Sequence, residues 1–233
     1  MTNKTVAQIV ASDMRTATIF KKYGIDFCCG GGKPVTEACK GKEVEASTIF
    51  SEIDNLDVSK AETDYNKMDL DVLANYIKEV HHSYVLEASP IILQFADKVA
   101  KVHGHSHPEN IAIAKLFREV ALELEQHMMK EEGILFPHII NLAIANRKEE
   151  SISVPFGSVQ NPIKMMEHEH DSAGDIFKEI ERLTNNYTPP AHACNTYKAL
   201  YHHLKEFQDD LHIHIHLENN ILFPKAIKME KNS

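Results

Sequence analysis

The sequence contains no long apolar run. None of its hydrophobic stretches approaches the about 18 consecutive residues that a membrane-spanning helix needs. The first residues, MTNKTVAQIVASDMR, lack the apolar block of a secretory signal. A basic excess is missing as well, because the formal net charge is −9, whereas a nucleic-acid surface needs a basic stripe. We therefore expect a cytoplasmic protein that binds neither membranes nor nucleic acid.

Cysteine is scarce and histidine is abundant. The four cysteines, Cys28, Cys29, Cys39 and Cys194, are expected to be thiols rather than a disulfide framework. The 15 histidines are unevenly distributed, and none occurs in the first 80 residues. This asymmetry indicates two parts of the chain with different chemistry.

Helical spacing of apolar residues recurs throughout, and strand-like alternation is not sustained anywhere. We expect a small helical domain over residues 1–57, a polar linker over 58–68 and a larger domain over 69–233. The larger domain contains four long helical patterns, which run over about 69–101, from Pro108 past Glu131, from Asn161 to Leu183, and from after Pro190 past Glu218. The predicted fold is therefore all-α, an antiparallel four-helix bundle preceded by a small helical domain.

Two of these helices repeat one pattern. His127-Met-Met-Lys-Glu131 is followed by Glu-Gly-Ile-Leu-Phe-Pro, and His214-Ile-His-Leu-Glu218 is followed by Asn-Asn-Ile-Leu-Phe-Pro. In each segment the histidine and the glutamate are four positions apart, so they lie on one helix face, one turn apart. The apolar residues upstream lead into both pairs by steps of three and four: Leu116, Val120 and Leu124 in one, Leu204, Phe207 and Leu211 in the other. Both pairs therefore face the bundle core.

A buried carboxylate without a partner is costly, so two of them in one core need a cation. The third helix adds His170 in the middle of its apolar stripe. The first helix adds His81 or His82, between which periodicity does not choose. Four histidines and two glutamates are too many ligands for one tetrahedral zinc. They fit two metals of borderline hardness that share two bridging carboxylates and keep open positions for O2, NO, water or hydroxide.

Simpler interpretations exist for each residue. A histidine–glutamate pair is often a surface or capping pair, and a lone core histidine is often merely hydrogen-bonded, but the repeat and its phase favour a metal site. Glu169 and Glu123 either line the access to the metals or belong to a solvated face. The histidines between the first two long helices, His103, His105 and His107, are expected to form a solvated loop. The adjacent thiols Cys28 and Cys29 are either incidental or functional. Three glycines follow them, which favours exposure and, with it, reactivity or transient metal binding.

These residues carry a family resemblance that covers nearly the whole chain. The segment Tyr23-Gly-Ile-Asp-Phe-Cys28-Cys29-Gly-Gly resembles the small N-terminal domain of the repair-of-iron-centres proteins, the ScdA and YtfE group. The segments from His127 and His214 resemble their hemerythrin-like domain. The resemblance places the first-helix ligand at His82. It implies two non-haem iron ions, oxo- or hydroxo-bridged when oxidised, held by six residues: His82, His127, Glu131, His170, His214 and Glu218.

The resemblance implies repair of iron–sulfur clusters damaged by nitrosative or oxidative stress, by donation of iron to damaged iron–sulfur proteins. The alternatives are an NO reductase that forms N2O, with Glu169 as a proton source, and a sensor of O2 or NO, so enzymatic activity stays open. One departure bears on this choice. Oxygen-carrying hemerythrins use a fifth histidine four residues along the third helix, where this chain has Gly174. A more open site favours chemistry or iron transfer over reversible binding of O2. The protein is expected to be a monomer or a homodimer.

Overall fold

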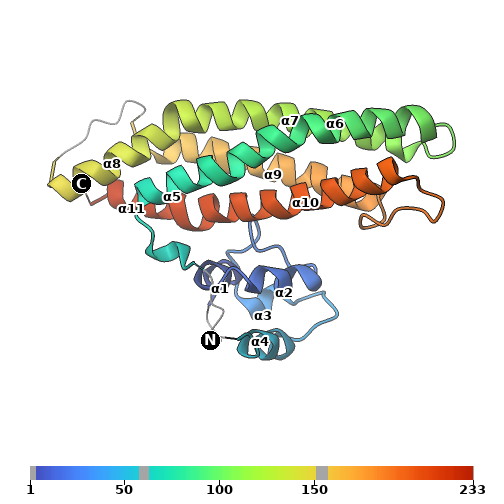
Figure 1. The fold of residues 1–233 in the computed structure, drawn as a ribbon. Helices are drawn as coiled ribbons and strands as arrows, with labels where there is room; N and C mark the ends of the chain where they lie inside the picture. The colour runs from blue at the N-terminus through green and yellow to red at the C-terminus, as the bar shows by residue number, and fades with distance from the viewer. Residues whose placement is uncertain (1–3, 58–62, 151–156, 233) are drawn as a thin grey trace. The chain divides into compact units, whose positions relative to one another are not determined.

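The computed structural model describes residues 4–57, 63–150 and 157–232. Within these ranges the chain is helical and forms no β-strand, so the prediction of an all-α protein is confirmed (Figure 1). The described chain divides into two compact units. One contains residues 75–138 and 160–211, and the other contains residues 1–74, 139–159 and 212–233.

The first of these units, the bundle unit, contains the predicted long helices. They are α6 (Ser83–His103), α7 (Glu109–Lys130), α9 (Gln160–Leu183) and α10 (Asn195–Leu217), the last of which lies in this unit as far as Leu211. Helix α7 packs against both α6 and α9. Helix α9 begins at Gln160, one residue before the start that the sequence pattern indicated, and it ends at Leu183 as expected.

An aromatic cluster forms the middle of the bundle unit. Phe117 of α7, Phe177 of α9 and Phe207 of α10 are fully buried. The rings of Phe177 and Phe207 stack at 5.6 Å, and Phe117 meets Phe207 edge-on at 5.3 Å. Such ring pairs stabilise a core beyond the area that they bury. These ring contacts join α7, α9 and α10 along the buried apolar face that also carries the histidines.

In the part of the chain that the structure describes, three π-helical turns interrupt the α-helices. They are η3 (Lys78–His82), η4 (Glu131–Leu135) and η5 (Glu218–Leu222). Turns η4 and η5 lead directly into α8 (Phe136–Lys148) and α11 (Phe223–Glu230), whose second residue is proline in both cases. Proline has no N–H and clashes with the carbonyl four residues earlier, so the preceding turn widens. The repeated Ile-Leu-Phe-Pro sequence thus corresponds to a repeated backbone feature.

The other compact unit, the N-terminal unit, starts with four short helices. They are α1 (Val6–Ser12), α2 (Thr16–Lys22), α3 (Val35–Ala38) and α4 (Ala46–Asp54). Thr5 caps α1 through a capping box with Gln8, which satisfies the first amide groups of the helix. Helix α1 packs against η5, and so the N-terminal helices and the end of the fourth long helix share a core.

The segment between the N-terminal helices and the bundle includes a 3-10 turn, η2 (Tyr65–Lys67), followed by α5 (Leu70–Ile77). Lys225 of α11 donates to the backbone carbonyls of Asn66 and Met68 at 2.6 and 3.0 Å, which ties η2 to α11. The first part of the predicted linker, residues 58–62, lies outside the described residues. The predicted domain boundaries therefore stay predictions.

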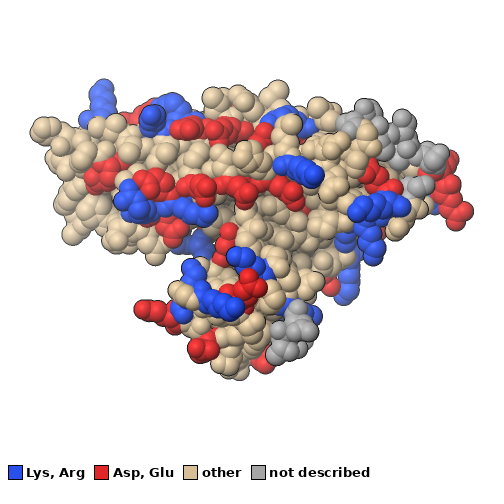
Figure 2. All heavy atoms as spheres, turned by 180° about the vertical axis from the view of Figure 1, so that it is seen from behind, with Lys and Arg blue, Asp and Glu red and all other residues tan. Residues whose placement is uncertain are grey.

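No helix of the described chain is long and apolar enough to cross a membrane. Figure 2 shows acidic side chains in a row along one face of the long helices, with isolated basic side chains between them. This face does not carry the continuous basic stripe that nucleic-acid binding requires.

Candidate metal centre

Glu131 is the centre of a buried cluster in the bundle unit. One of its carboxylate oxygens, Oε2, lies 3.3 Å from Nε2 of His127 and 3.4 Å from Nε2 of His82. All three residues are at most 1% exposed. The π-helical turns contribute to this arrangement, because His82 is the last residue of η3 and Glu131 the first of η4. Two imidazoles thus approach one carboxylate oxygen in a site without bulk water.

His170 of α9 completes the cluster in this unit. Its Nε2 lies 3.0 Å from Nε2 of His127, and the two rings are 4.7 Å apart between centroids. One ligand atom each of His127, Glu131 and His170 lies within 4.8 Å of the other two. The adjacent His81 is directed elsewhere, because its Nδ1 contacts Asp210 at 2.9 Å. Of the two candidates on the first helix, His82 is therefore the one beside Glu131.

The second histidine–glutamate pair belongs to the N-terminal unit. His214, in the last turn of α10, has its Nε2 3.1 Å from Oε1 of Glu218, the first residue of η5. Both residues are fully buried. The local geometry thus repeats that of His127 and Glu131, with a histidine ending an α-helix and a glutamate opening a π-helical turn.

A carboxylate orients each of two histidines of this cluster. Nδ1 of His82 contacts Glu132 at 3.0 Å, and Nδ1 of His127 contacts Glu169 at 2.9 Å. A carboxylate that accepts the Nδ1–H leaves the Nε2 lone pair free for a metal, which is the usual arrangement around metal-bound histidine. The sequence pattern alone did not predict this role of Glu132, although its place directly after Glu131 was a signal that could have indicated it.

Both orienting carboxylates also contact a lysine. Lys78 lies 3.0 Å from Glu132, and Lys130 forms a hydrogen bond to Glu169. Partial burial opposes ionisation of Glu169, but the hydrogen bonds from Lys130 and His127 outweigh it, and the pKa of Glu169 is lowered. The pKa of Glu132 is lowered in the same way, with Lys78 as its cation. An ionised Glu169 is better suited to orient His127 than to act as the proton source that the sequence suggested.

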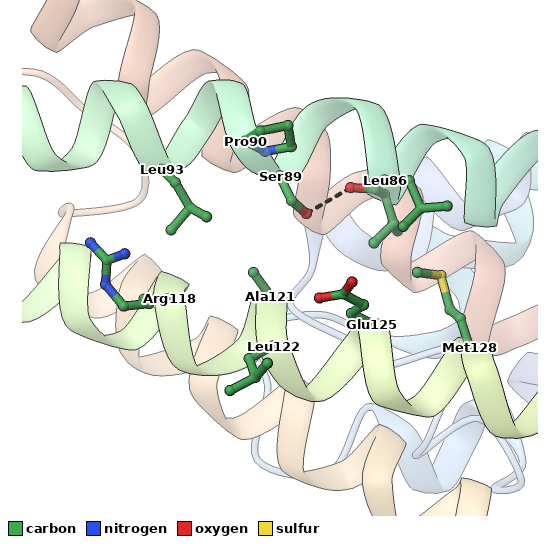
Figure 3. A pocket seen from close by; sticks show the side chains of 10 residues that line it. Leu86, Ser89, Pro90, Leu93, Arg118, Ala121, Leu122, Glu125 and Met128 are labelled. Carbon is green, nitrogen blue, oxygen red and sulfur yellow. Dashed lines mark hydrogen bonds between the residues drawn. The ribbon is translucent and has the colours of Figure 1, made fainter.

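A surface pocket reaches this cluster between α7 and α9. It has a volume of about 220 Å³, and His127, Lys130 and Glu169 line it together with Glu123. A second hollow, between α6 and α7, is mostly apolar and has Glu125 as the only carboxylate in its lining (Figure 3). The first pocket therefore leads to possible metal ligands, and the second does not.

The donor set matches a metal centre. Imidazole nitrogens and carboxylate oxygens together suit first-row ions of borderline hardness. A buried glutamate is stable only when its charge is compensated, which a cation between the donors achieves. The buried histidine–glutamate cluster can therefore hold a metal cation.

Comparison with known proteins agrees with this chemistry. The family model described as the hemerythrin HHE cation binding domain matches residues 74–226. A second model, ScdA_N, described as a domain of unknown function, matches residues 2–57. The chain is similar over almost its full length to proteins named iron–sulfur cluster repair protein. This chain belongs to the ScdA/YtfE repair family.

Relatives in the repair family come from several bacteria. The chain is 34% identical over 221 residues to the iron–sulfur cluster repair protein ScdA of Staphylococcus haemolyticus, with 94% of this chain and 96% of the relative covered. It is 37% identical over 225 residues to YtfE of Citrobacter koseri, with 97% of each chain covered. It is also 37% identical over 227 residues to a probable repair protein of Haemophilus influenzae, with 95% and 96% covered.

The ScdA_N region carries the cysteine pair of this family member. Cys28 is buried and Cys29 is partly exposed, so the expectation that both thiols are exposed is wrong for Cys28. The amide and the thiol of Cys28 both donate to Asp26, at 2.9 and 3.2 Å. The hydrogen bond with Cys29, burial and the Asp26 charge all raise the pKa of the Cys28 thiol.

The cysteine loop is attached to the end of the hemerythrin domain. Asn220 donates to the backbone carbonyl of Cys28 at 2.8 Å, and the carbonyl of Phe27 lies 3.2 Å from Nδ1 of His216. His216 is fully buried. Burial lowers the pKa of His216 to about 4, against the opposing contact with Phe27. These contacts lie within two residues of Glu218.

Proposed function

We propose that this protein holds two iron ions and donates iron to damaged iron–sulfur clusters. The six proposed ligands are the histidines and glutamates that the sequence pattern and the family resemblance select: His82, His127, Glu131, His170, His214 and Glu218. Each ion would receive two imidazoles and two bridging carboxylates. The observation that carries the proposal is the position of the Glu131 carboxylate, fully buried between the Nε2 atoms of His82 and His127.

The names of the relatives support cluster repair as the function. Proteins at 34–37% identity over almost the whole chain are named iron–sulfur cluster repair proteins. Damaged iron–sulfur proteins are accordingly the proposed clients. The alternatives from the sequence, NO reduction to N2O and sensing of O2 or NO, are not favoured by these names. A cytoplasmic location and a monomeric or dimeric state remain expectations.

The openness of the site supports transfer of iron to another protein rather than permanent retention of the iron. A Cβ atom added at Gly174 would meet nothing within 4 Å, so the missing fifth histidine is not replaced by another bulky side chain at that point. The pocket between α7 and α9 offers a path, because Glu123 and Glu169 line it next to His127. Carboxylates along such a path attract a cation on its way in or out.

The chain's own residues have three tasks in this scheme. Glu131 and Glu218, which are both fully buried, would neutralise the charge of the iron cargo. Glu132 and Glu169 keep His82 and His127 in the tautomer that presents Nε2. Lys78 and Lys130 hold those two carboxylates in the ionised form.

A transfer assay tests the proposal. The protein is loaded with 57Fe, separated from free iron and mixed without oxygen with an iron–sulfur enzyme whose cluster has been damaged by nitric oxide. We expect 57Fe in the client cluster and recovery of the client's activity. Glu131→Ala should hold little iron and restore little activity, whereas Glu167→Ala, a change at an exposed position of α9, should behave like the wild type. N2O formation with no transfer of label would contradict the repair function.

Metal content is measured on the same preparations. Two irons per chain in the wild type, and loss of both in Glu131→Ala, are the expected results. One stoichiometric zinc, or no metal at all, would contradict the proposed centre itself. The two measurements therefore separate failure of the metal site from failure of iron donation.

A further inference from the structure

A second group of histidines lies at the other end of the bundle helices. His103 ends α6, His107 stands in the turn before α7, and His192 lies in the loop before α10. The sequence suggested a solvated loop here. His105 is exposed as expected, but His103 and His107 are partly buried.

His107 and His192 face each other through their ring nitrogens. The two Nε2 atoms are 2.9 Å apart, and the ring centroids are 4.9 Å apart. The backbone supports this position, because the amide of His107 donates to the carbonyl of His103 at 2.8 Å. The two histidines are 85 residues apart in the sequence, so only the packing of the bundle brings them together.

Glu109 defines the tautomer of His107. Its Oε1 lies 2.9 Å from Nδ1 of His107. A carboxylate accepts a hydrogen bond, so Nδ1 carries the hydrogen of a neutral His107 and its Nε2 presents a lone pair toward His192. This carboxylate–histidine arrangement is the one that usually supports a metal ligand.

We propose that His107 and His192 bind a divalent transition-metal ion of the zinc class at this end of the bundle. Zinc–nitrogen bonds are about 2.0–2.1 Å long, so nitrogens 2.9 Å apart subtend an angle of about 90° at a shared ion. A small separation of the two rings, by a few tenths of an ångström, brings this angle to the tetrahedral value. The remaining positions are open to water, because His192 is exposed, and the bound ion is therefore exchangeable.

A thiol–imidazole pair lies beside the proposed site. Sγ of Cys194 is 3.6 Å from Nε2 of His103. The ring of Tyr197 contacts both histidines of this region, with centroids 5.3 Å from His103 and 6.2 Å from His107. Nitrogen and sulfur donors at one surface favour zinc-class ions over calcium or magnesium. The proposed ligands of the ion are the two facing imidazoles of His107 and His192.

This site is separate from the candidate iron centre. His103 follows His82 by 21 residues along helical chain, which corresponds to about 30 Å. No residue of the histidine pair takes part in the proposed iron site. Zinc binding at His107 and His192 and iron binding at Glu131 can therefore fail independently.

Calorimetric titration of the iron-loaded protein with Zn2+ tests the proposal, with iron content measured before and after. We expect one zinc ion per chain beyond the iron, lost in the double variant His107→Gln/His192→Gln and bound about tenfold more weakly in Glu109→Gln. The matched control is His202→Gln/His203→Gln, which removes two neighbouring histidines of α10 whose rings lie 5.6 Å apart. This control should bind zinc like the wild type.

Three results would overturn the inference. One is a wild type that binds no zinc beyond its iron site, which would leave a plain hydrogen bond between the two imidazoles. Another is loss of iron in step with zinc uptake, which would place zinc in the buried centre. The last is loss of zinc binding in Cys194→Ser with retention in the double histidine variant, which would assign the ion to the thiol.

Discussion

Asn220 donates a hydrogen bond to the backbone carbonyl of Cys28 and so fixes the cysteine loop two residues beyond Glu218. The contact joins residues that are 192 positions apart, and it lies within one compact unit. The loop that carries the two thiols is thereby attached directly to the helix segment that carries a proposed iron ligand. Movement of the loop and the position of that segment are therefore coupled.

Removal of this contact should release the loop. In Asn220→Ala the carbonyl of Cys28 loses its partner, so we expect a loss of about 1–2 kcal/mol in the free energy of unfolding. Alkylation of Cys28 in the folded protein should become faster relative to Cys39, which serves as the internal reference. Asn232→Ala, at an exposed position near the end of the chain, is the control. Unchanged alkylation of Cys28 would show that other contacts hold the loop.

The orienting carboxylates should affect metal affinity without being ligands. We expect Glu132→Gln and Glu169→Gln each to weaken iron binding by about 10- to 100-fold, because His82 and His127 lose their charged Nδ1 partners. Competition with a chromophoric chelator measures the affinity. Glu167→Gln, which neutralises an exposed glutamate on the same helix as Glu169, should keep the wild-type affinity. Equal affinities in all variants would mean that Nδ1 orientation is unimportant here.

Metal removal should destabilise the protein through Glu131. Burial of a carboxylate costs free energy that a bound cation offsets, so chelation should lower the melting temperature of the wild type. In Glu131→Gln the uncharged side chain removes that cost, and the metal-free variant should be at least as stable as the metal-free wild type. Added iron should stabilise the variant much less than the wild type. Thermal melts of the wild type and of Glu131→Gln, each with and without iron, give the four melting temperatures.

The raised pKa of Cys28 gives a pH dependence with a defined sign. The folded protein keeps this thiol neutral, whereas the unfolded chain ionises it above about pH 8.5. The stabilisation is therefore complete below that pH and is lost as the pH rises. At pH 9.5 the loss is on the order of 1 kcal/mol relative to neutral pH.

Urea unfolding at pH 7.5 and 9.5 measures this loss, and Cys28→Ser should not show it. An equal loss in wild type and Cys28→Ser would assign the pH dependence to other groups. Alkylation of the folded protein at pH 8 should, by the same reasoning, modify Cys29 before Cys28.

Much of the fold and of the candidate site follows from the spacing of side chains. In a helix with 3.6 residues per turn, the sequence position of a residue indicates the helix face on which its side chain lies. The core positions of His127, His170 and His214 were therefore predictable from the apolar residues around them. The repeated histidine–glutamate spacing likewise placed Glu131 and Glu218 in the core. The family resemblance added His82, which periodicity did not separate from His81.

Other parts of the site depend on contacts between helices. The choice between His81 and His82 follows in the structure from Asp210, which contacts His81 from α10. The pairing of Glu169 with His127 spans 42 residues and depends on how α9 is aligned with α7. A sequence pattern specifies the face of one helix, but not its axial alignment with another.

The sequence by itself determined that this chain is helical and that its two repeated histidine–glutamate pairs face a core, because these properties depend on the local spacing of side chains. Only the tertiary structure decided that Cys28 is buried, that Glu132 and Glu169 contact His82 and His127, and that His107 meets His192. The reason is physical: burial and hydrogen bonding of these groups depend on the distance and alignment of separately formed helices, which the packing of side chains sets.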